Sequence, residues 1–486
     1  MTLAQILRNT SAANPTATAF HSPTQAITWQ QLETTSNALA AWLLQQGLQP
    51  QDRVAIHWPN SIETIQLLIA TIKAGLIAVP VNTRLKAPEI AFVLQHSAAR
   101  LCFSEPSFGA AAGPNVLQAL PTLDAAPATL PETDPNQPAV IVYTSGTTSR
   151  PKGATHSQTT LLACTQMLVE SVTMQGAEIA MLTPPMMHMS GICALLRAIH
   201  IGSTAYILPA FQPAAVLDTI ERYRCTFSGG LPAMVHALAE EQARNPRDMS
   251  SIRVMLAAGD TVPVALQQRV QSLFGVPIVE FYGMTEAFPI ACNPPSAVRA
   301  GSFGRAVRGM EIRLIDPSGN NVAPGETGEV IVRSQGICIG YWDDPQATAA
   351  LIQDGWLHTG DLASLDPDGY YVFRGRLKEI IVRAGSNISP QEVEEALYRH
   401  PAVLEAGVIG LPDPVLGQQV AAFIALRPEH QVTTGELIEF TRQHLADYKA
   451  PEQIFFIAQL PKGLTGKVHR RSLHAMVPVD PSHSFL

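Results

Sequence analysis

The sequence predicts an α/β protein with a large N-terminal body of parallel or mixed sheets and a small α+β C-terminal domain. Strand-like and helix-like segments alternate through most of the chain, a pattern typical of βαβ units. After residue 376 the pattern changes to several strands separated by only two helices. The length of 486 residues, with 46% apolar and 15% charged residues, favours a large buried core and more than one domain.

The N-terminal body is predicted from two runs of alternating segments. Short apolar stretches predict strands, and longer stretches with helical periodicity predict helices. The first run has strands at 53–58, 78–81 and 100–104 and helices at 61–74 and 87–98. The second run has strands at 205–210, 225–229, 252–259 and 277–283 and helices at 213–223, 232–243 and 263–273. Between the two runs, residues 106–137 are rich in proline and alanine and predict a loop-rich connection.

The C-terminal domain has its own sequence signals. Ser389, Pro390 and Glu392 predict a sharp helix start, with Ser389 at the N-cap and Glu392 completing a capping box. A third helix is expected after residue 467. The predicted strands are at 379–383, 403–410, 419–426 and 453–458.

Composition excludes several classes of protein. The net charge of −8, without a block rich in Lys and Arg, gives no reason to expect a nucleic-acid partner. None of the six cysteines lies in a C-x-x-C pair, so we expect buried thiols in a reducing compartment, the cytoplasm. The start of the chain does not read as a signal peptide. The apolar segment 61–81 is interrupted by charged residues, and we expect no transmembrane segment there.

The hydroxyl-rich stretch "YTSGTTSRPKG" (143–153) predicts a phosphate-binding loop. It follows the apolar strand-like run 139–143, and helix-compatible sequence begins near Thr159. Hydroxyl groups can donate to phosphate oxygens, and Lys152 adds a positive charge. Pro151 removes a backbone donor where the Walker loop has glycine, so a Walker-type nest of amides is excluded. The interpretation is a flexible clamp that donates from side chains.

This string resembles the signature loop of the adenylate-forming superfamily, which includes acyl-CoA synthetases, peptide-synthetase adenylation domains and luciferases. Ser149 stands where that family usually has glycine. Further motifs of the family recur in order along nearly the whole chain. The resemblance implies an ATP site to which this loop contributes Thr144, Ser145, Gly146, Thr147, Thr148 and Lys152, with Thr148 also near the metal.

The stretch "EFYGMTEA" (280–287) resembles the family's Y-G-x-T-E motif. The resemblance implies that Tyr282 lies against adenine, Thr285 touches the α-phosphate and Glu286 binds the Mg²⁺ of Mg-ATP. A carboxylate is the hard oxygen ligand that Mg²⁺ prefers. The same nucleotide wall is expected to include Ala258, Gly259, Asp260, Phe281, Gly283 and Met284.

The stretches "GWLHTGDLA" (355–363) and "FRGRLKEIIVRAGSNISPQEVE" (373–394) resemble the ribose and hinge motifs. Asp361 is the expected ribose ligand, Arg376 meets ribose or phosphate, and Lys378 is the hinge residue. Two departures, Ala384 and Ser386, stand in the family's G-G-E-N loop. The resemblance implies coenzyme A contacts from Gly385, Ser386 and Asn387.

The stretch "LPKGLTGKVHR" (460–470) resembles the closing motif of the family. Lys467 is then expected on a mobile loop, where it offsets charge that develops between carboxylate and α-phosphate. The implied domains are an adenylation domain, 1–377, and a mobile C-terminal domain, 378–486. Arg308 replaces the usual proline of a G-x-x-x-P-G motif, which we interpret as a local loop change.

The implied reaction joins a carboxylate to a thiol through an acyl-adenylate, with ATP, Mg²⁺ and coenzyme A. The stretch "PPMMHMSGI" (184–192) resembles the acyl-pocket segment, with His188 as the gate residue and a candidate catalytic group beside Lys467, Thr285 and Glu286. No acidic residue lies in 184–196 to bind a substrate amine, so an apolar monocarboxylic acid, fatty or aromatic, is favoured. The expected pocket residues are His188, Met189, Gly230, Ala257, Gly283 and Met284.

Three alternatives stay open from the sequence. The enzyme could load the acid onto the phosphopantetheine arm of a carrier protein, although no carrier domain follows in this chain. A non-catalytic relative could hold acyl-AMP, but intact Glu286, Asp361 and Lys467 argue against that. Luciferase chemistry is possible as well, but no residue in the sequence points to it. Monomer and homodimer are both compatible with the sequence.

Overall fold

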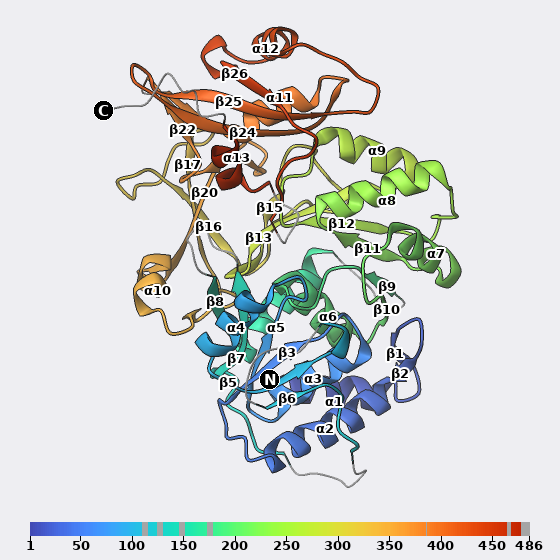
Figure 1. Cartoon of the computed structure of the whole chain (residues 1–486). Helices are drawn as coiled ribbons and strands as arrows, with labels where there is room; N and C mark the ends of the chain where they lie inside the picture. Colours follow the sequence, from blue (N-terminus) through green and yellow to red (C-terminus); the bar gives the residue numbers. More distant parts are fainter. Residues whose placement is uncertain are drawn as a thin grey trace. The chain divides into compact units, whose positions relative to one another are not determined.

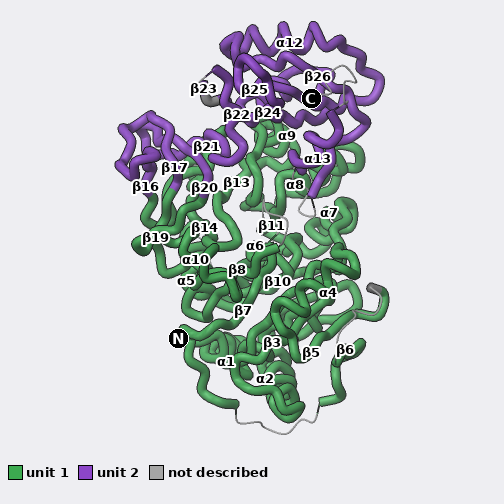
Figure 2. The backbone as a smooth tube through the Cα atoms, turned by 60° about the vertical axis from the view of Figure 1, so that its left-hand side comes forward, with its two compact units in different colours: residues 1–312, 331–359 green, residues 313–330, 360–486 purple. Residues whose placement is uncertain are grey.

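The chain folds into two compact units, coloured separately in Figure 2. Unit 1 comprises residues 1–312 and 331–359, and unit 2 comprises residues 313–330 and 360–486. The chain passes between the units within β16 (Glu311–Ile315), β17 (Thr327–Arg333) and β20 (Trp356–Leu365). The computed structural model describes residues 1–108, 115–123, 130–144, 151–172, 178–384, 386–463 and 468–477.

Two sheets form the body of unit 1 (Figure 1). The nine-stranded sheet has the order β15 (Arg305–Ala306), β14 (Ala287–Cys292), β13 (Ile278–Met284), β12 (Val254–Ala258), β11 (Phe227–Gly230), β9 (Ile179–Leu182), β10 (Thr204–Ile207), β1 (Thr18–His21) and β2 (Ala26–Thr28). The seven-stranded sheet has the order β18 (Gly340–Tyr341), β8 (Lys152–Ser157), β7 (Pro138–Thr144), β4 (Ile77–Pro80), β3 (Arg53–His57), β5 (Ala99–Ser104) and β6 (Val116–Leu117).

Helices cover these sheets, and the segments predicted from the alternating pattern are confirmed. Strands β9, β11, β12 and β13 pair with one another in parallel, as βαβ connections require. Helices α7, α8 and α9 bury their apolar faces with β12 and β13 in one core cluster. The helices of unit 1 are α1 (Leu3–Ala13), α2 (Trp29–Gln45), α3 (Ile62–Lys73), α4 (Ala87–His96), α5 (Gln158–Ser171), α6 (Met189–Ile201), α7 (Pro213–Tyr223), α8 (Pro232–Arg244), α9 (Val264–Phe274) and α10 (Pro345–Leu351).

One element of unit 1 differs from expectation. The helix expected near Thr159 is confirmed as α5, but strand β8, which was not predicted, precedes it and pairs antiparallel with β7. Thr144 lies opposite Lys152, and Tyr143 lies opposite Gly153. The helix then begins at Gln158, with the Ser157 hydroxyl accepting from the Thr160 amide. The loop therefore joins two paired strands rather than a strand and a helix.

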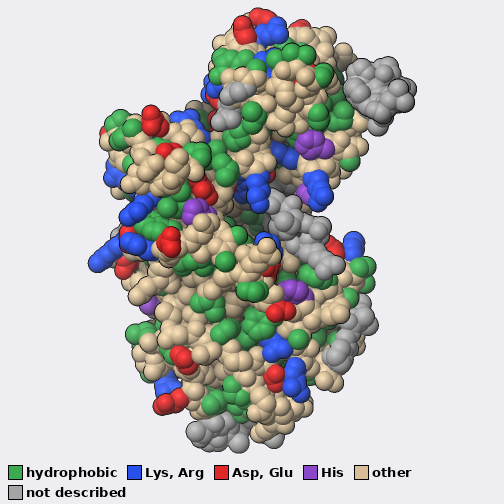
Figure 3. Space-filling view, turned by 90° about the vertical axis from the view of Figure 1, so that its left-hand side faces the viewer, with side chains coloured by type: hydrophobic (Ala, Val, Ile, Leu, Met, Phe, Trp, Pro, Cys, Tyr) green, Lys and Arg blue, Asp and Glu red, His purple; other side chains and the backbone are tan. Residues whose placement is uncertain are grey.

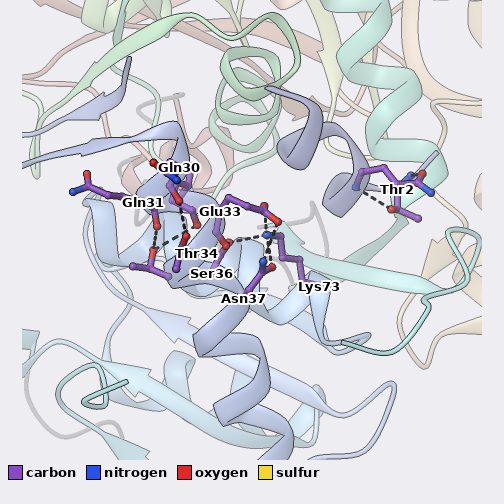
Figure 4. Close-up of polar contacts among 11 residues, drawn as sticks. Thr2, Gln30, Gln31, Glu33, Thr34, Ser36, Asn37 and Lys73 are labelled. Carbon is purple, nitrogen blue, oxygen red and sulfur yellow. Dashed lines mark hydrogen bonds and ion pairs between the residues drawn. The ribbon is translucent and has the colours of Figure 1, made fainter. Parts of the chain in front are cut away.

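A buried polar cluster joins helices α2 and α3 (Figure 4). The Lys73 side chain is fully buried, and its Nζ donates to Glu33 Oε2 at 2.6 Å, Asn37 Oδ1 at 2.8 Å and Ser36 Oγ at 2.9 Å. Burial lowers the pKa of Lys73, and the Glu33 carboxylate partly opposes this. Three acceptors use all three donors of the ammonium group, which is what burial of a charge requires.

Unit 2 contains the small α+β domain expected from the sequence. Strand β20 pairs antiparallel with β21 (Tyr371–Arg376). A separate sheet has the order β23 (Ser386–Ile388), β22 (Ile381–Arg383), β25 (Gly417–Leu426) and β24 (Val403–Asp413), with β26 (Gln453–Phe456) beside β25. The helices of this part of the chain are α11 (Pro390–Tyr398), α12 (Thr434–Arg442) and α13 (Arg470–Met476). Buried aliphatic residues of the sheet pack against α11 and α12.

The predicted start of α11 is only partly right. Ser389 is the N-cap residue and Pro390 the first helical residue, as predicted, but the Ser389 side chain makes no capping hydrogen bond. The capping-box role of Glu392 is wrong, because its carboxylate accepts from Lys449 Nζ at 2.7 and 2.8 Å. Glu392 therefore forms a salt bridge with Lys449 instead of capping the start of α11.

The surface carries charges of both signs. On the face drawn in Figure 3, Lys and Arg side chains are mixed with Asp and Glu rather than gathered in one continuous field. In the part of the chain that the structure describes, none of the helices has both the length and the apolar character that a membrane crossing needs.

Candidate active site

Several of the expected nucleotide and acyl residues of unit 1 lie at one edge of the nine-stranded sheet. Parallel pairing places Gly230 of β11 beside Ala257 of β12, and Ala258 beside Phe281 of β13. These positions are at the carboxyl ends of the three strands, where open α/β sheets bind ligands. The structure thus brings together segments that lie far apart in the sequence.

Glycines shape this edge. Gly259 follows β12 with a φ of +94°, and an added Cβ would lie 2.8 Å from Leu231 Cδ2. At Gly283 an added Cβ would lie 2.7 Å from the Phe288 ring. Asp260, the next residue after Gly259, is exposed and its carboxylate accepts from the Thr261 amide at 2.9 Å.

The Thr-Glu motif lies in a β-hairpin turn, not at a helix start. Met284 ends β13 and pairs with Ala287, the first residue of β14, so Thr285 and Glu286 form the turn between them. The Tyr282 ring is mostly buried, and its centroid lies 4.4 Å from that of Phe303. Phe303 therefore fixes the orientation of the ring expected to meet adenine.

A buried histidine forms a hydrogen bond with the backbone of this turn. His156 of β8 is fully buried, and its Nε2 lies 2.8 Å from the Thr285 carbonyl oxygen. Since a carbonyl only accepts, Nε2 carries the hydrogen, and Nδ1 lies 3.2 Å from Thr160 Oγ1. Burial lowers the pKa of His156 to about 4, partly opposed by the bond to Thr285, so the ring is neutral near pH 7.

Glu286 is held from the other side by an aromatic residue. The Tyr341 hydroxyl donates to Glu286 Oε1 at 2.7 Å. Burial, and next the Glu286 charge, raises the pKa of Tyr341, so the phenol keeps its proton. Lys152 Nζ lies 4.9 Å from the centroid of the same ring, within the range of a cation–π interaction.

The expected acyl-pocket segment surrounds the start of α6. His188 is the N-cap residue, partly buried, and Met189 begins the helix as a buried residue. Burial, and next the charge of Arg84, lowers the pKa of His188 to about 4. The ring is therefore neutral near pH 7 and offers no charge to a substrate.

The expected ribose residues pair within unit 2. Asp361 of β20 and Arg376 of β21 are cross-strand neighbours, and Arg376 Nε lies 3.0 Å from Asp361 Oδ1. Asp361 is 6% exposed, whereas 41% of the Arg376 side chain is exposed. The strand thus fixes the carboxylate, and the guanidinium opposite it orients it further.

The hinge and coenzyme A segments of unit 2 are described in part. Lys378 lies in an exposed turn after β21, and Ser386 begins β23. Ala384 has a φ of +48°, a left-handed conformation that costs an L-residue with a side chain about 1–2 kcal/mol. This is the position where the adenylate-forming family has glycine.

Several predicted residues lie outside the described part of the chain. They are four residues of the hydroxyl-rich loop and two residues of the C-terminal part, and of Asn387 only the backbone is described. Nearby described residues are well anchored: Arg470 binds Glu394 at 2.7 and 2.9 Å and Glu379 at 2.9 Å. The residues outside are Ser145, Gly146, Thr147, Thr148, Gly385 and Lys467.

Comparison with known proteins decides the family. The family model described as AMP-binding enzyme matches residues 7–342, and the model of the AMP-binding enzyme C-terminal domain matches residues 392–467. The chain belongs to the AMP-binding enzyme family. This confirms the resemblance to the adenylate-forming superfamily and makes the chain an enzyme of the class of AMP-forming acid–thiol ligases.

Relatives of this AMP-binding enzyme match along nearly its whole length. It is 37% identical to a feruloyl-CoA synthase of Amycolatopsis sp, over 94% of this chain and 96% of that protein. It is 33% identical to the fatty acid–acyl-carrier-protein ligase ScoC of Streptomyces coeruleorubidus, over 97% and 96% of the two chains. The anthranilate CoA ligase AuaEII in complex with anthranoyl-AMP superposes with a TM-score of 0.92 at 27% identity, covering 98% and 97%.

The donor set of this AMP-binding enzyme fits a metal that enters with its nucleotide. Among the described residues, no group of three or more His, Cys, Asp or Glu side chains could hold a metal ion. Mg²⁺ bound to a nucleotide needs only one or two carboxylates besides phosphate oxygens and water. Glu286 supplies one buried carboxylate, which fits Mg-ATP as substrate.

Sequence reasoning did not identify Tyr341 or His156 as parts of this site. Tyr341 lies 55 positions after Glu286, and His156 lies 129 positions before Thr285. Neither belongs to a motif with a chemical signature of its own. Only the pairing of β8 with β18 and the packing under the hairpin turn bring them to the site.

Proposed function

We propose that this enzyme uses Mg-ATP to convert an apolar monocarboxylic acid, fatty or aromatic, into an acyl-adenylate, with release of pyrophosphate, and then transfers the acyl group to the thiol of coenzyme A, with release of AMP. The arrangement of Thr285 and Glu286 carries the proposal. Both residues lie in one hairpin turn at the ligand-binding edge of the sheet, supported by His156 and Tyr341. Lys152, from the phosphate-binding segment, belongs to the same cluster.

The reaction needs positioning and charge stabilisation rather than a nucleophilic side chain. The substrate carboxylate attacks the α-phosphorus of ATP, and pyrophosphate leaves. Thr285 donates to an α-phosphate oxygen, Tyr282 packs on adenine and Asp361 accepts from the ribose hydroxyls. Mg²⁺, when bound with ATP, neutralises phosphate charge and would be held by Glu286 and Thr148. Lys467 would offset the charge that develops between the carboxylate and the α-phosphate.

The acid class is inferred from the segment around His188. Its imidazole is neutral near pH 7, and Met186, Met187 and Met189 beside it are buried. Thioethers make adaptable apolar linings that suit aliphatic and aromatic groups alike. The relative named as a feruloyl-CoA synthase supports an aromatic acid, and the one named as a fatty acid ligase supports an aliphatic acid.

Coenzyme A is proposed as the acceptor, and a carrier-protein arm is the alternative. The relative named as a CoA synthase supports the first, and ScoC supports the second. We place the enzyme in the cytoplasm, because all six cysteines are buried free thiols, as a reducing compartment allows.

A screen with fatty, cyclic and aromatic acids tests the proposal. Each acid is incubated with Mg-ATP and coenzyme A, and AMP, pyrophosphate and acyl-CoA are quantified by mass spectrometry. The expected result is AMP and acyl-CoA in equal amounts with at least one acid. Glu286→Gln is the matched variant, and it should lose adenylation on the order of 10²-fold.

Two other outcomes would reject parts of the proposal. AMP without acyl-CoA, combined with acylation of an added phosphopantetheine carrier protein, would establish the alternative acceptor. Absence of AMP and pyrophosphate with every acid would overturn the ligase reaction itself.

A further inference from the structure

The segment 336–342 lies between the phosphate-binding strand and the Thr-Glu turn. Its backbone binds both: Cys338 N donates to Glu286 O at 2.7 Å, and Trp342 N donates to Gly153 O at 2.7 Å. Tyr341 is paired with Ala154 in the antiparallel bridge between β18 and β8. The backbone at Tyr341 is therefore fixed relative to both groups that its side chain contacts.

The Tyr341 side chain makes two different contacts with two charged residues. Its hydroxyl donates to Glu286 Oε1 at 2.7 Å, which restricts rotation of the carboxylate about its last bond. Its ring lies 4.9 Å from Lys152 Nζ, a distance at which the ring attracts the ammonium group. Both contacts lie within unit 1.

We propose that Tyr341 is a positioning residue for Mg-ATP, orienting the Glu286 carboxylate through its hydroxyl and the Lys152 ammonium through its ring. This inference rests on the assignment of Glu286 and Lys152 to Mg-ATP in the proposed function. The two contacts have separate consequences, since one depends on the O–H and the other on the aromatic face.

Tyr341→Phe and Tyr341→Leu separate the two contacts. Phenylalanine keeps the ring and loses only the donor, so the Mg²⁺ concentration that gives half-maximal ATP binding should rise about tenfold. Leucine loses both, so the Kd for ATP at saturating Mg²⁺ should rise as well, by about threefold. Isothermal titration of the full-length protein with ATP at several Mg²⁺ concentrations, without acid or coenzyme A, measures both effects.

Steady-state kinetics supplies a second readout. The KM for Mg-ATP should rise in Tyr341→Phe, while the KM values for the acid and coenzyme A stay within twofold of wild type. Tyr206→Phe is the matched control, because it removes the hydroxyl of a tyrosine whose ring stacks on Tyr223 in another part of unit 1. It should leave the Mg²⁺ dependence unchanged.

A double-mutant comparison distinguishes positioning from a general structural role. In a Glu286→Gln background, Tyr341→Phe should change Mg²⁺-dependent ATP binding by less than twofold, because the carboxylate that it orients is gone. A tenfold effect that persists in that background would overturn the proposal, as would wild-type Mg²⁺ dependence in folded Tyr341→Phe.

Thermal midpoints without nucleotide show whether each variant is folded. If Tyr341→Phe fails to fold, Tyr341→His, which keeps a ring and an N–H donor, takes its place. If the Mg²⁺ concentration for half-maximal ATP binding stays at the wild-type value in Tyr341→His, the donor role is supported. A tenfold rise of that concentration in a folded Tyr341→His protein contradicts it. Because ATP binding is measured without turnover, the result is informative even if no acid in the screen yields AMP.

Discussion

His188 is kept neutral by its surroundings, and this links its protonation to stability. Its pKa falls from 6.5 to about 4 on folding, because burial and the charge of Arg84 disfavour the imidazolium. Between pH 6.5 and 4 the unfolded chain binds a proton that the folded chain does not bind. Stability contributed by the neutral ring is therefore lost as the pH falls through this window.

A variant that lacks only the His188 imidazole should lack this loss. Wild type is expected to lose about 1–2 kcal/mol more than His188→Asn when the pH is lowered from 7 to 5. Thermal midpoints of the two proteins, measured in parallel at pH 7, 6 and 5, test this. A difference between them that does not change with pH would contradict the assigned pKa.

At the scale of single residues, the sequence motifs predicted where residues lie in the fold better than which side chains they contact. Thr285 and Glu286 lie in the turn after β13, and Asp361 is paired with Arg376, a contact that the ribose and hinge motifs did not predict. The capping box of Ser389 failed because Lys449, 57 positions after Glu392, competes for its carboxylate. Local propensity cannot register a partner so distant in the chain.

At the scale of elements, Lys73 determines how α2 and α3 are joined (Figure 4). Lys73→Met would leave the Glu33 carboxylate without its closest cation in a largely buried setting. We expect a cost of about 3 kcal/mol, seen as a lower thermal midpoint. Lys86→Met, at an exposed position of the same unit, is the control and should cost about 0.5 kcal/mol or less. Equal midpoints for the two variants would contradict the structural role of the cluster.

Helix α6 has little room near its start. At Gly191 an added Cβ would lie 2.1 Å from the Pro185 carbonyl oxygen. Gly191→Ala must therefore shift α6 and with it His188, at a cost of about 1–3 kcal/mol and a raised KM for the acid.

Gly435→Ala makes the same change in α12, where nothing lies within 4 Å of the added carbon. It should stabilise the protein by about 0.5–1 kcal/mol. Thermal midpoints and acid saturation curves measure both variants. A Gly191→Ala protein as stable as wild type would show that the α6 contact can relax.

Many elements could be predicted from periodicity, but β8 could not. The alternating runs predicted β3–β5 and β10–β13 with the helices between them, because each buries a regular apolar pattern. Strand β8 begins with Lys152 and Gly153 and has no alternation that distinguishes it from the loop before it. It is a strand because β7 and β18 pair with it on either side.

At the scale of the whole molecule, we expect Lys467 to serve the first of the two half-reactions and not the second. Lys467→Ala should reduce adenylate formation on the order of 10²–10³-fold and leave transfer from a synthetic acyl-adenylate to coenzyme A near wild type. Pyrophosphate release measures the first half and acyl-CoA formation the second.

Lys462→Ala is the matched control. This lysine forms an ion pair with Glu405 elsewhere in the C-terminal part of the chain. Both half-reactions should proceed at wild-type rates in that variant. Equal loss of the two half-reactions in Lys467→Ala would reject the separate role of Lys467.

The division of the chain was harder to predict than its elements. The change in the pattern of expected strands and helices after residue 376, together with the family resemblance, predicted a single boundary near Lys378, and the hinge there stays a prediction. The compact units instead change at 312/313, 330/331 and 359/360, each inside a strand. A chain that crosses several times within regular strands leaves no linker-like composition at the crossings.

These crossings affect how such enzymes can be recombined with their relatives. A chimaera joined at Lys378 takes the sheet of β22–β26 from one parent but keeps residues 313–330 and 360–377 from the other. Asp361 and Arg376 then share one ancestry, whereas the lysine-bearing loop comes from the second parent. The pair expected to bind ribose thus stays together in such a chimaera, while the lysine expected to act in adenylation comes from the other parent.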